Sequence, residues 1–217
     1  MSTPEHLMVF IDGQNLLYGC MDFARKQKPG YEFRYREEDL LTLLVGLRPN
    51  RRLMQTRFYT SYSMRNLQRF EKQRKKLDVL ESRLKWVVVR KEAKTYPYYC
   101  PRCSHASRLV QLGCPSCGLQ LETTENKGVD VALAIDLLLY GLVEPQNGGY
   151  DVAMLVSGDR DFVSVIEVLK QRRPACAVEV AQFTSNAGQE LRNAARVFYP
   201  LEDHAAKFGS WVEKHSG

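Results

Sequence analysis

The stretch that decides the fold is LMVFID at residues 7–12, which runs directly into GQNL at residues 13–16. Its first five side chains are apolar without interruption, and a run of this length is typical of a strand buried on both faces of a sheet. The run ends in Asp12, just before a helical pattern. It therefore predicts the first strand–helix unit of a parallel sheet, with Asp12 at the edge where such sheets bind their ligands.

Further strand and helix patterns alternate along the rest of the chain. We expect strands at 53–62, 84–89, 152–156 and 177–183 and a short one at 197–199, and helices at 16–25, 37–47, 64–80, 131–142, 161–171 and 187–195. Strands that alternate with helices in this way predict an α/β fold, in which a central parallel sheet is covered by helices on both faces.

Composition narrows the class of protein further. The chain has 217 residues, of which 44% are hydrophobic, so it is long and apolar enough to bury the core of one domain and is not disordered as a whole. Its apolar runs are far shorter than the roughly 20 residues of a membrane-spanning helix, and no secretory signal is readable at the start. We therefore expect a cytoplasmic protein with no membrane partner.

Four aspartates are expected to meet at the carboxyl edge of the sheet. Asp12 ends the first strand, Asp159 and Asp161 follow the strand at 152–156, and Asp130 opens the helix near 131. Carboxylates at close range repel one another unless they are protonated or share a cation. Mg²⁺ and Mn²⁺ prefer such oxygen ligands, and a site of this kind can activate water for phosphoryl transfer.

Each of these aspartates also has a purely local explanation. Asp159 is a suitable helix N-cap, Asp161 suits the positive end of a helix dipole, and Asp12 suits a turn before glycine. It is less plausible that all four aspartates serve only such local roles at the same sheet edge than that they form a common site. Asp136 lies six residues beyond Asp130, about 240° around an ideal helix, so we expect it to have a supporting or structural role.

Three further polar residues flank the predicted site as candidates for substrate binding. Asn15 and Ser157 could hydrogen-bond a phosphate or a neighbouring carboxylate, although Asn15 could equally cap a helix and Ser157 could satisfy only its own loop. Lys127 places a cation near Asp130, which suits either a phosphate or a plain salt bridge.

Four of the six cysteines form two C-x-x-C pairs in one short window. They are Cys100, Cys103, Cys114 and Cys117. Two such pairs supply the four thiolates of a tetrahedral structural zinc site, without an open position for catalysis, and redox chemistry is the weaker alternative. We expect residues 93–125 to be a small zinc-ribbon insertion that divides the main domain into 5–92 and 126–202, followed by a C-terminal tail at 203–217.

Positive charge is concentrated in one part of the chain. The net charge is +6, and between residues 65 and 94 basic side chains outnumber acidic ones by eleven to four. This asymmetry favours binding to a polyanion such as nucleic acid, although a solvated helix face would look the same.

Three motifs, taken together, resemble those of a known family. They are FIDGQNL at residues 10–16, KGVDV at 127–131 and LVSGDRDF at 155–162. In this order they resemble the NYN domain, the LabA-like branch of the PIN-domain nucleases. The resemblance implies a Rossmann-like, three-layer α/β/α sandwich and an Mg²⁺- or Mn²⁺-dependent ribonuclease. It makes Asp12, Asp130, Asp159 and Asp161 the metal-binding carboxylates and Asn15 an accessory residue.

The sequence therefore predicts an enzyme that hydrolyses RNA phosphodiester bonds. The cysteine-rich insertion departs from the plain family pattern and leaves the choice of RNA open. A non-catalytic RNA-binding or adaptor protein with the same fold is the main alternative. A phosphatase with Asp12 as nucleophile ranks third, because Gln14 stands where the common haloacid-dehalogenase pattern has a second aspartate. A homodimer is compatible with such a sheet.

Overall fold

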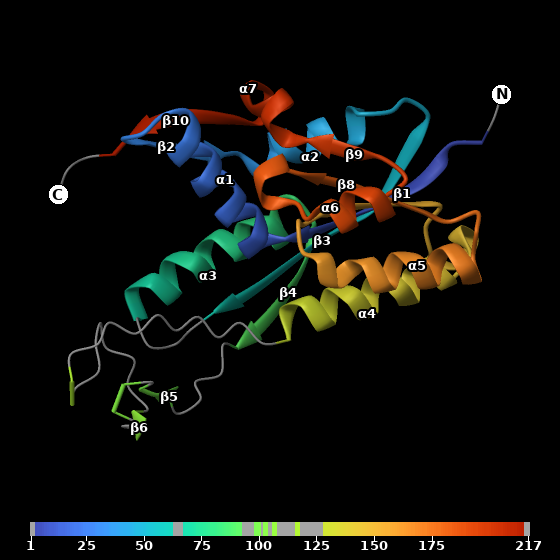
Figure 1. Cartoon of the computed structure of the whole chain (residues 1–217). Helices are drawn as coiled ribbons and strands as arrows, with labels where there is room; N and C mark the ends of the chain where they lie inside the picture. The colour runs from blue at the N-terminus through green and yellow to red at the C-terminus, as the bar shows by residue number, and fades with distance from the viewer. Residues whose placement is uncertain are drawn as a thin grey trace.

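The computed structural model describes residues 3–62, 67–92, 98–100, 102–103, 106–107, 116–117 and 128–214. Its centre is a six-stranded sheet in which every neighbouring pair is parallel, with the order β4-β3-β1-β7-β8-β9 (Figure 1). The strands are β1 (Glu5–Asp12), β3 (Arg51–Tyr62), β4 (Val87–Glu92), β7 (Val152–Val156), β8 (Ala177–Gln182) and β9 (Phe198–Pro200).

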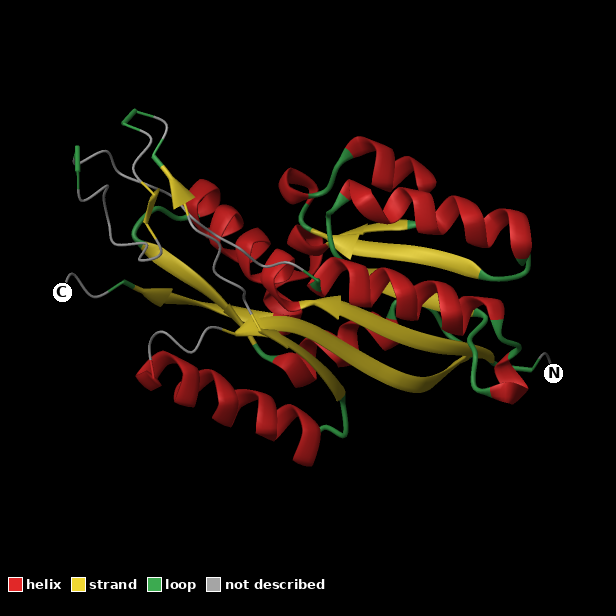
Figure 2. Cartoon of the chain, turned by 90° about the horizontal axis from the view of Figure 1, so that it is seen from below, coloured by secondary structure: helices red, strands yellow, loops and turns green. Residues whose placement is uncertain are grey.

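Helices cover both faces of this sheet (Figure 2). One face carries α1 (Gly13–Gln27), α2 (Glu37–Gly46) and α3 (Leu67–Ser82), and the other carries α4 (Val129–Leu142), α5 (Val163–Arg172) and α6 (Gln189–Ala194). The strand period of two explains the two cores: along β1, Val9 and Ile11 pack into the first core, whereas Met8 and Phe10 pack into the second. The predicted α/β/α sandwich is confirmed.

A second, two-stranded sheet was not predicted from the sequence. It pairs β2 (Tyr31–Tyr35) with β10 (Gly209–Glu213) in antiparallel register. The ring centroid of Phe33 lies 5.3 Å from that of Phe23 and 5.4 Å from that of Trp211. These aromatic contacts bind the segment 203–213, which we expected only as a tail, to the main core.

Short elements complete the described structure. They are β5 (Tyr98–Tyr99) and β6 (Ala106–Ser107), which pair antiparallel within the cysteine segment, α7 (Ala205–Phe208), and the 3₁₀ turns η1 (Pro145–Asn147), η2 (Arg160–Phe162), η3 (Thr184–Asn186) and η4 (Leu201–His204). Among the described residues, no helix combines the length and the apolar character needed to cross a membrane.

Buried charges at the amino-terminal edge of the sheet are paired. The Glu179 carboxylate is fully buried and accepts hydrogen bonds from Arg51 at 2.8 and 3.0 Å and from Arg196 at 2.6 Å. Burial alone would raise the pKa of Glu179, but the two arginines hold it below its ordinary value. This network joins the starts of β3 and β8 to the segment before β9, and its charges offset one another.

The outer face of α4 is apolar, unlike the usual solvent face of a surface helix. Val131, Ile135, Leu139 and Leu142 are 45–61% exposed, and their spacing places them along one side of the helix. We refer to these four residues as the α4 stripe. It lies opposite the buried residues Leu133 and Leu137, which pack on the sheet.

Candidate acidic site

Asp12 lies at the carboxyl end of β1 and also begins α1. Its Oδ1 accepts hydrogen bonds from the backbone N–H groups of Gln14 (3.2 Å) and Asn15 (3.0 Å), which makes it the N-cap of the helix. Its Oδ2 accepts a hydrogen bond from the Ser157 hydroxyl at 3.2 Å. The local role as a cap and a role in a shared site are therefore compatible, because the two oxygens face different partners.

The strand–helix turn at Asp12 requires a glycine at the next position. A Cβ at Gly13 would lie 2.3 Å from the tip of the Phe58 ring, which is buried in the core between β3 and α1. A side chain at this position would therefore displace the start of α1 and, with it, the carboxylate that α1 holds.

The charge of Asp12 is poorly compensated. The side chain is 3% exposed and takes part in no ion pair among the described residues. Burial raises the pKa of Asp12 to about 6, and the negative charge of Asp130 adds to the rise, although hydrogen bonds from Asn15 and Ser157 oppose it. Glu179, also buried at the other edge of the sheet, pairs with two arginines, whereas Asp12 pairs with none among the described residues.

The negative charge of Asp130 interacts with the charges of the other three predicted aspartates. Asp130 lies in the first turn of α4, two residues after the N-cap Gly128, whose φ of +97° favours glycine. Burial raises the pKa of Asp130, and the charges of Asp159 and Asp161 raise it further. Because Asp130 also acts on Asp12, the four predicted aspartates are coupled at one edge of the sheet.

The loop after β7 carries Asp159 and Asp161. The Asp159 carboxylate accepts a hydrogen bond from the backbone N–H of Asp161 at 2.9 Å and caps η2. The backbone N–H of Asp159 donates to the Ser157 hydroxyl, which in turn donates to Asp12. Ser157 therefore links the two strand ends, while its own side chain is fully buried.

The side-chain oxygen of Asn15 forms hydrogen bonds with three other segments of the chain. Its Oδ1 accepts hydrogen bonds from the backbone N–H of Gly158 (2.8 Å), from Gln182 Nε2 (2.8 Å) and from Asn186 Nδ2 (3.0 Å). A Cβ at Gly158 would lie 1.9 Å from the Asn186 carbonyl oxygen, so only glycine permits this approach. These contacts support an orienting function, and the predicted contact of Asn15 with substrate stays a prediction.

The contributions of Gln182 and Asn186 were not found from the sequence. Gln182 ends β8 and is fully buried, and a polar residue at the carboxyl end of an apolar strand is the signal that would have identified it. Asn186 lies in the turn η3 and is brought to Asn15 only by the tertiary fold.

Asp136 faces a different environment. Its Oδ2 accepts hydrogen bonds from Arg57 and from the Tyr59 hydroxyl, both at 2.8 Å. These contacts fasten α4 to β3 and give Asp136 the structural role that its position on the helix predicted.

The four aspartates form an open group. Among the described residues, no three carboxylates bring their oxygens within 4.8 Å of one another. Like charges keep such groups apart. An oxygen-only donor set in which Asp12 and Asp130 have raised pKa values is nevertheless one that a hard dication such as Mg²⁺ or Mn²⁺ fits, because the cation offsets the repulsion.

The cysteine segment brings three thiols together. The Sγ atoms of Cys100, Cys103 and Cys117 lie within 4.8 Å of one another, and those of Cys100 and Cys117 are 3.5 Å apart. Tetrahedral ligands at zinc–sulfur distances of about 2.3 Å lie roughly 3.8 Å from each other. Burial raises the pKa of the Cys100 thiol, but the N–H groups of Cys103 and Arg102 lower it to about 6, which favours the thiolate.

Two predicted residues lie outside the part of the chain that the structure describes. They are Cys114, the fourth predicted zinc ligand, and Lys127, the predicted cation beside Asp130. Both stay predictions from the sequence.

The parallel α/β sandwich is consistent with the PIN-like fold. The family model of the NYN domain matches residues 6–202, and the chain belongs to this family, which acts on nucleic acids. A crystal structure of a protein of unknown function from Vibrio parahaemolyticus is similar, with a TM-score of 0.60 and 20% identity over 97% of this chain and 99% of that one. At this identity the likeness concerns the fold alone. No curated protein matches significantly.

The buried carboxylate of Asp12 predicts an unusual dependence of stability on pH. Its pKa of about 6 in the folded state lies above the ordinary value of 3.8, so ionisation destabilises the fold. Without divalent cations, the Asp12→Asn variant should gain stability over the wild type as pH rises from about 4 to 7, by up to about 3 kcal/mol. Urea unfolding at several pH values measures this difference.

The matched control is Glu167→Gln, which removes a half-exposed carboxylate on α5. Its stability should follow that of the wild type across the same pH range. Parallel curves for Asp12→Asn and the wild type would contradict the buried, uncompensated charge.

Proposed function

We propose that this protein is a metal-dependent ribonuclease that hydrolyses RNA phosphodiester bonds. The observation that carries the proposal is the negative charge at the carboxyl edge, where Asp12 is 3% exposed and has no cationic partner among the described residues. Burying an unpaired carboxylate costs folding free energy. Binding of a dication would offset that cost and would explain why the carboxylate is buried there. A cytoplasmic location, predicted from the sequence, is part of the proposal.

In this mechanism, Asp12, Asp130, Asp159 and Asp161 would hold Mg²⁺ or Mn²⁺. Such an ion would supply the Lewis acidity that activates water and offsets charge on the scissile phosphate. Ser157 orients the Asp12 carboxylate through the hydroxyl that donates to Oδ2. Asn15 holds the loops after β1, β7 and β8 in register. Lys127, which lies in the KGVD motif and outside the described residues, would contact a phosphate oxygen.

A non-catalytic RNA-binding or adaptor function is the second candidate. The observation in its favour is the spacing of the carboxylates, since in the described part of the chain no three of them approach within 4.8 Å. An adaptor would keep the nucleic-acid surface and the fold without using the acidic edge for turnover.

We also propose that the cysteine segment is a structural zinc ribbon. Cys100, Cys103, Cys114 and Cys117 supply four thiolates, which leaves no coordination position for chemistry. On this proposal residues 93–125 form an insertion within a main domain made of 5–92 and 126–202. A module of this size builds little core, so the metal provides most of its folding energy.

A homodimer is the third part of the proposal, with the α4 stripe as its contact. Four side chains at 45–61% exposure give an apolar patch of the size, about 300–600 Å², at which monomers usually hide or use such a surface. Two such patches meeting would bury about 600–1,200 Å² in total, at or below the lower limit of about 1,200 Å² for specific interfaces. The expected dimer is therefore weak.

Cleavage of labelled RNA in the presence of Mn²⁺ tests the ribonuclease. Asp12→Asn and Asp159→Asn should each reduce the rate by at least about 100-fold, because each removes a charged metal ligand. Asparagine keeps the capping ability of both positions. The control Glu167→Gln should cleave at the wild-type rate. Equal rates in the wild type and both aspartate variants would refute the assignment, and RNA binding without any turnover would favour the adaptor.

Metal analysis of the purified protein tests the zinc ribbon. We expect one zinc per chain in the wild type and a loss of most of it in Cys103→Ser and Cys114→Ser, since three thiolates bind zinc more weakly than four. The control is Cys176→Ala, which removes a buried cysteine from the main core. Zinc content that is unchanged in both serine variants would rule out this ligand set.

Sedimentation at rising protein concentration tests the dimer. Ile135→Glu places a charge in the α4 stripe and should abolish association. The matched control is Val79→Glu, which alters an equally exposed apolar residue on α3, on the other face of the sheet. A wild-type protein that stays monomeric, or a dimer that survives Ile135→Glu, speaks against this interface.

A further inference from the structure

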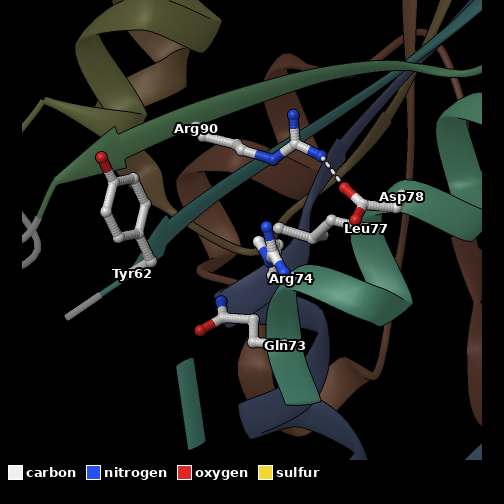
Figure 3. Close-up of a pocket in the computed structure, with 6 residues that line it drawn as sticks. All are labelled: Tyr62, Gln73, Arg74, Leu77, Asp78 and Arg90. Carbon is white, nitrogen blue, oxygen red and sulfur yellow. Dashed lines mark hydrogen bonds and ion pairs between the residues drawn. The ribbon is translucent and has the colours of Figure 1, made fainter. Parts of the chain in front are cut away.

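A pocket of about 280 Å³ lies between α3 and the carboxyl ends of β3 and β4. Its walls are formed by Tyr62, Gln73, Arg74, Leu77, Asp78 and Arg90. Figure 3 shows Tyr62 on one side, the side chains of α3 across from it, and Arg90 joined to Asp78. None of these residues belongs to the acidic site described above.

Hydrogen bonds connect this pocket to Asp12. The Gln14 backbone N–H donates to the Asp12 carboxylate, and its side-chain Nε2 donates to the Ser61 hydroxyl at 2.7 Å. Gln73, in the pocket wall, donates to the Ser61 carbonyl at 2.9 Å. Ser61 immediately precedes Tyr62 on β3, the strand beside β1. The pocket therefore adjoins the acidic edge, one strand away from Asp12.

The walls of the pocket combine an aromatic ring with guanidinium groups. Arg90 is held in place by Glu81 at 2.7 Å and Asp78 at 3.2 Å. Arg74 pairs with Glu71, but both side chains are about half exposed, and such a surface pair is weak enough to yield to a phosphate. Tyr62 and Leu77 provide the apolar surface between the charged groups.

The volume and the chemistry limit the ligand. Small-molecule pockets are roughly 300–1,000 Å³ in volume, so this one lies at the small end of that range and suits a single flat base better than an extended ligand. Bases of unpaired RNA stack on aromatic rings, and arginines contact the adjoining phosphates. Lys72 and Lys75, which neighbour Gln73 and Arg74 in sequence on α3, are exposed and form no ion pair among the described residues.

We propose that this pocket binds one unpaired nucleotide of an RNA strand, with the base against Tyr62 and Leu77 and a phosphate on Arg74. The inference rests on the proposed ribonuclease, because it places this nucleotide beside the phosphate at the acidic edge. It also specifies the substrate class as single-stranded RNA or an RNA loop, since a paired base cannot enter the pocket.

Binding without turnover tests the pocket. The full-length Asp12→Asn protein is titrated, without added divalent cations, against a labelled ten-nucleotide oligouridylate and a duplex RNA of equal length. In this background Tyr62→Leu should weaken binding of the single strand by about 5- to 150-fold, because it removes the stacking ring. Tyr62→Phe keeps the ring and should bind like its parent.

Arg74→Gln tests the phosphate contact at an exposed position, where a loss of folding is not expected. It should weaken binding and reduce the slope of log affinity against log salt by about 1. The control Lys170→Gln removes an exposed cation of α5, on the other face of the sheet, and should leave the slope unchanged. Duplex binding should be weak and insensitive to Tyr62→Leu.

Two outcomes overturn the proposal: Tyr62→Leu and Arg74→Gln binding the oligouridylate as tightly as their parent, or Tyr62→Phe losing as much affinity as Tyr62→Leu. The result is separate from the test of catalysis. Weakened binding by the pocket variants with no cleavage by the wild type would reject the ribonuclease alone. Active cleavage with normal binding by the pocket variants would reject the pocket alone.

Discussion

The site depends on one buried carboxylate. Asp12 ends the central strand, caps α1 and accepts a hydrogen bond from Ser157 on the neighbouring strand end. Its 3% exposure and raised pKa mean that the fold keeps negative charge where water cannot solvate it. The same sheet neutralises Glu179 with two arginines at its opposite edge. Among the described residues, the buried carboxylate at one edge of the sheet is therefore paired with cations, whereas the one at the other edge is not.

Most of the fold could be predicted because burial on both faces leaves a clear pattern in the sequence. The runs that form β1 and β7 are continuously apolar, and both became central strands. β2 was missed although YEFRY alternates apolar and polar residues, the mark of a half-buried strand. Its partner β10 lies far along the chain, and no local pattern indicates a pairing of that kind.

The predictability of the site differed from residue to residue. The aspartates stand at strand and helix ends, so their gathering follows from the topology of a parallel sheet. The hydrogen bonds of Asn15 to Gln182 and Asn186 follow only from the packing of three loops. The pocket could not be predicted from the sequence either, because Tyr62 and Arg74 lie on a strand and a helix that come together only in the tertiary structure.

The antiparallel pair of β2 and β10 includes a strand that lies beyond the residues matched by the NYN family model. The NYN model ends at residue 202, whereas Phe208 and Trp211 lie beyond it and contact Phe33 at 5.5 and 5.4 Å. A protein trimmed to the family limits would expose Phe33 together with Phe23, which stacks on Phe183 at 4.8 Å. Such a shortened protein would carry an exposed aromatic surface, and its poor solubility would be a consequence of the truncation and not of the acidic edge.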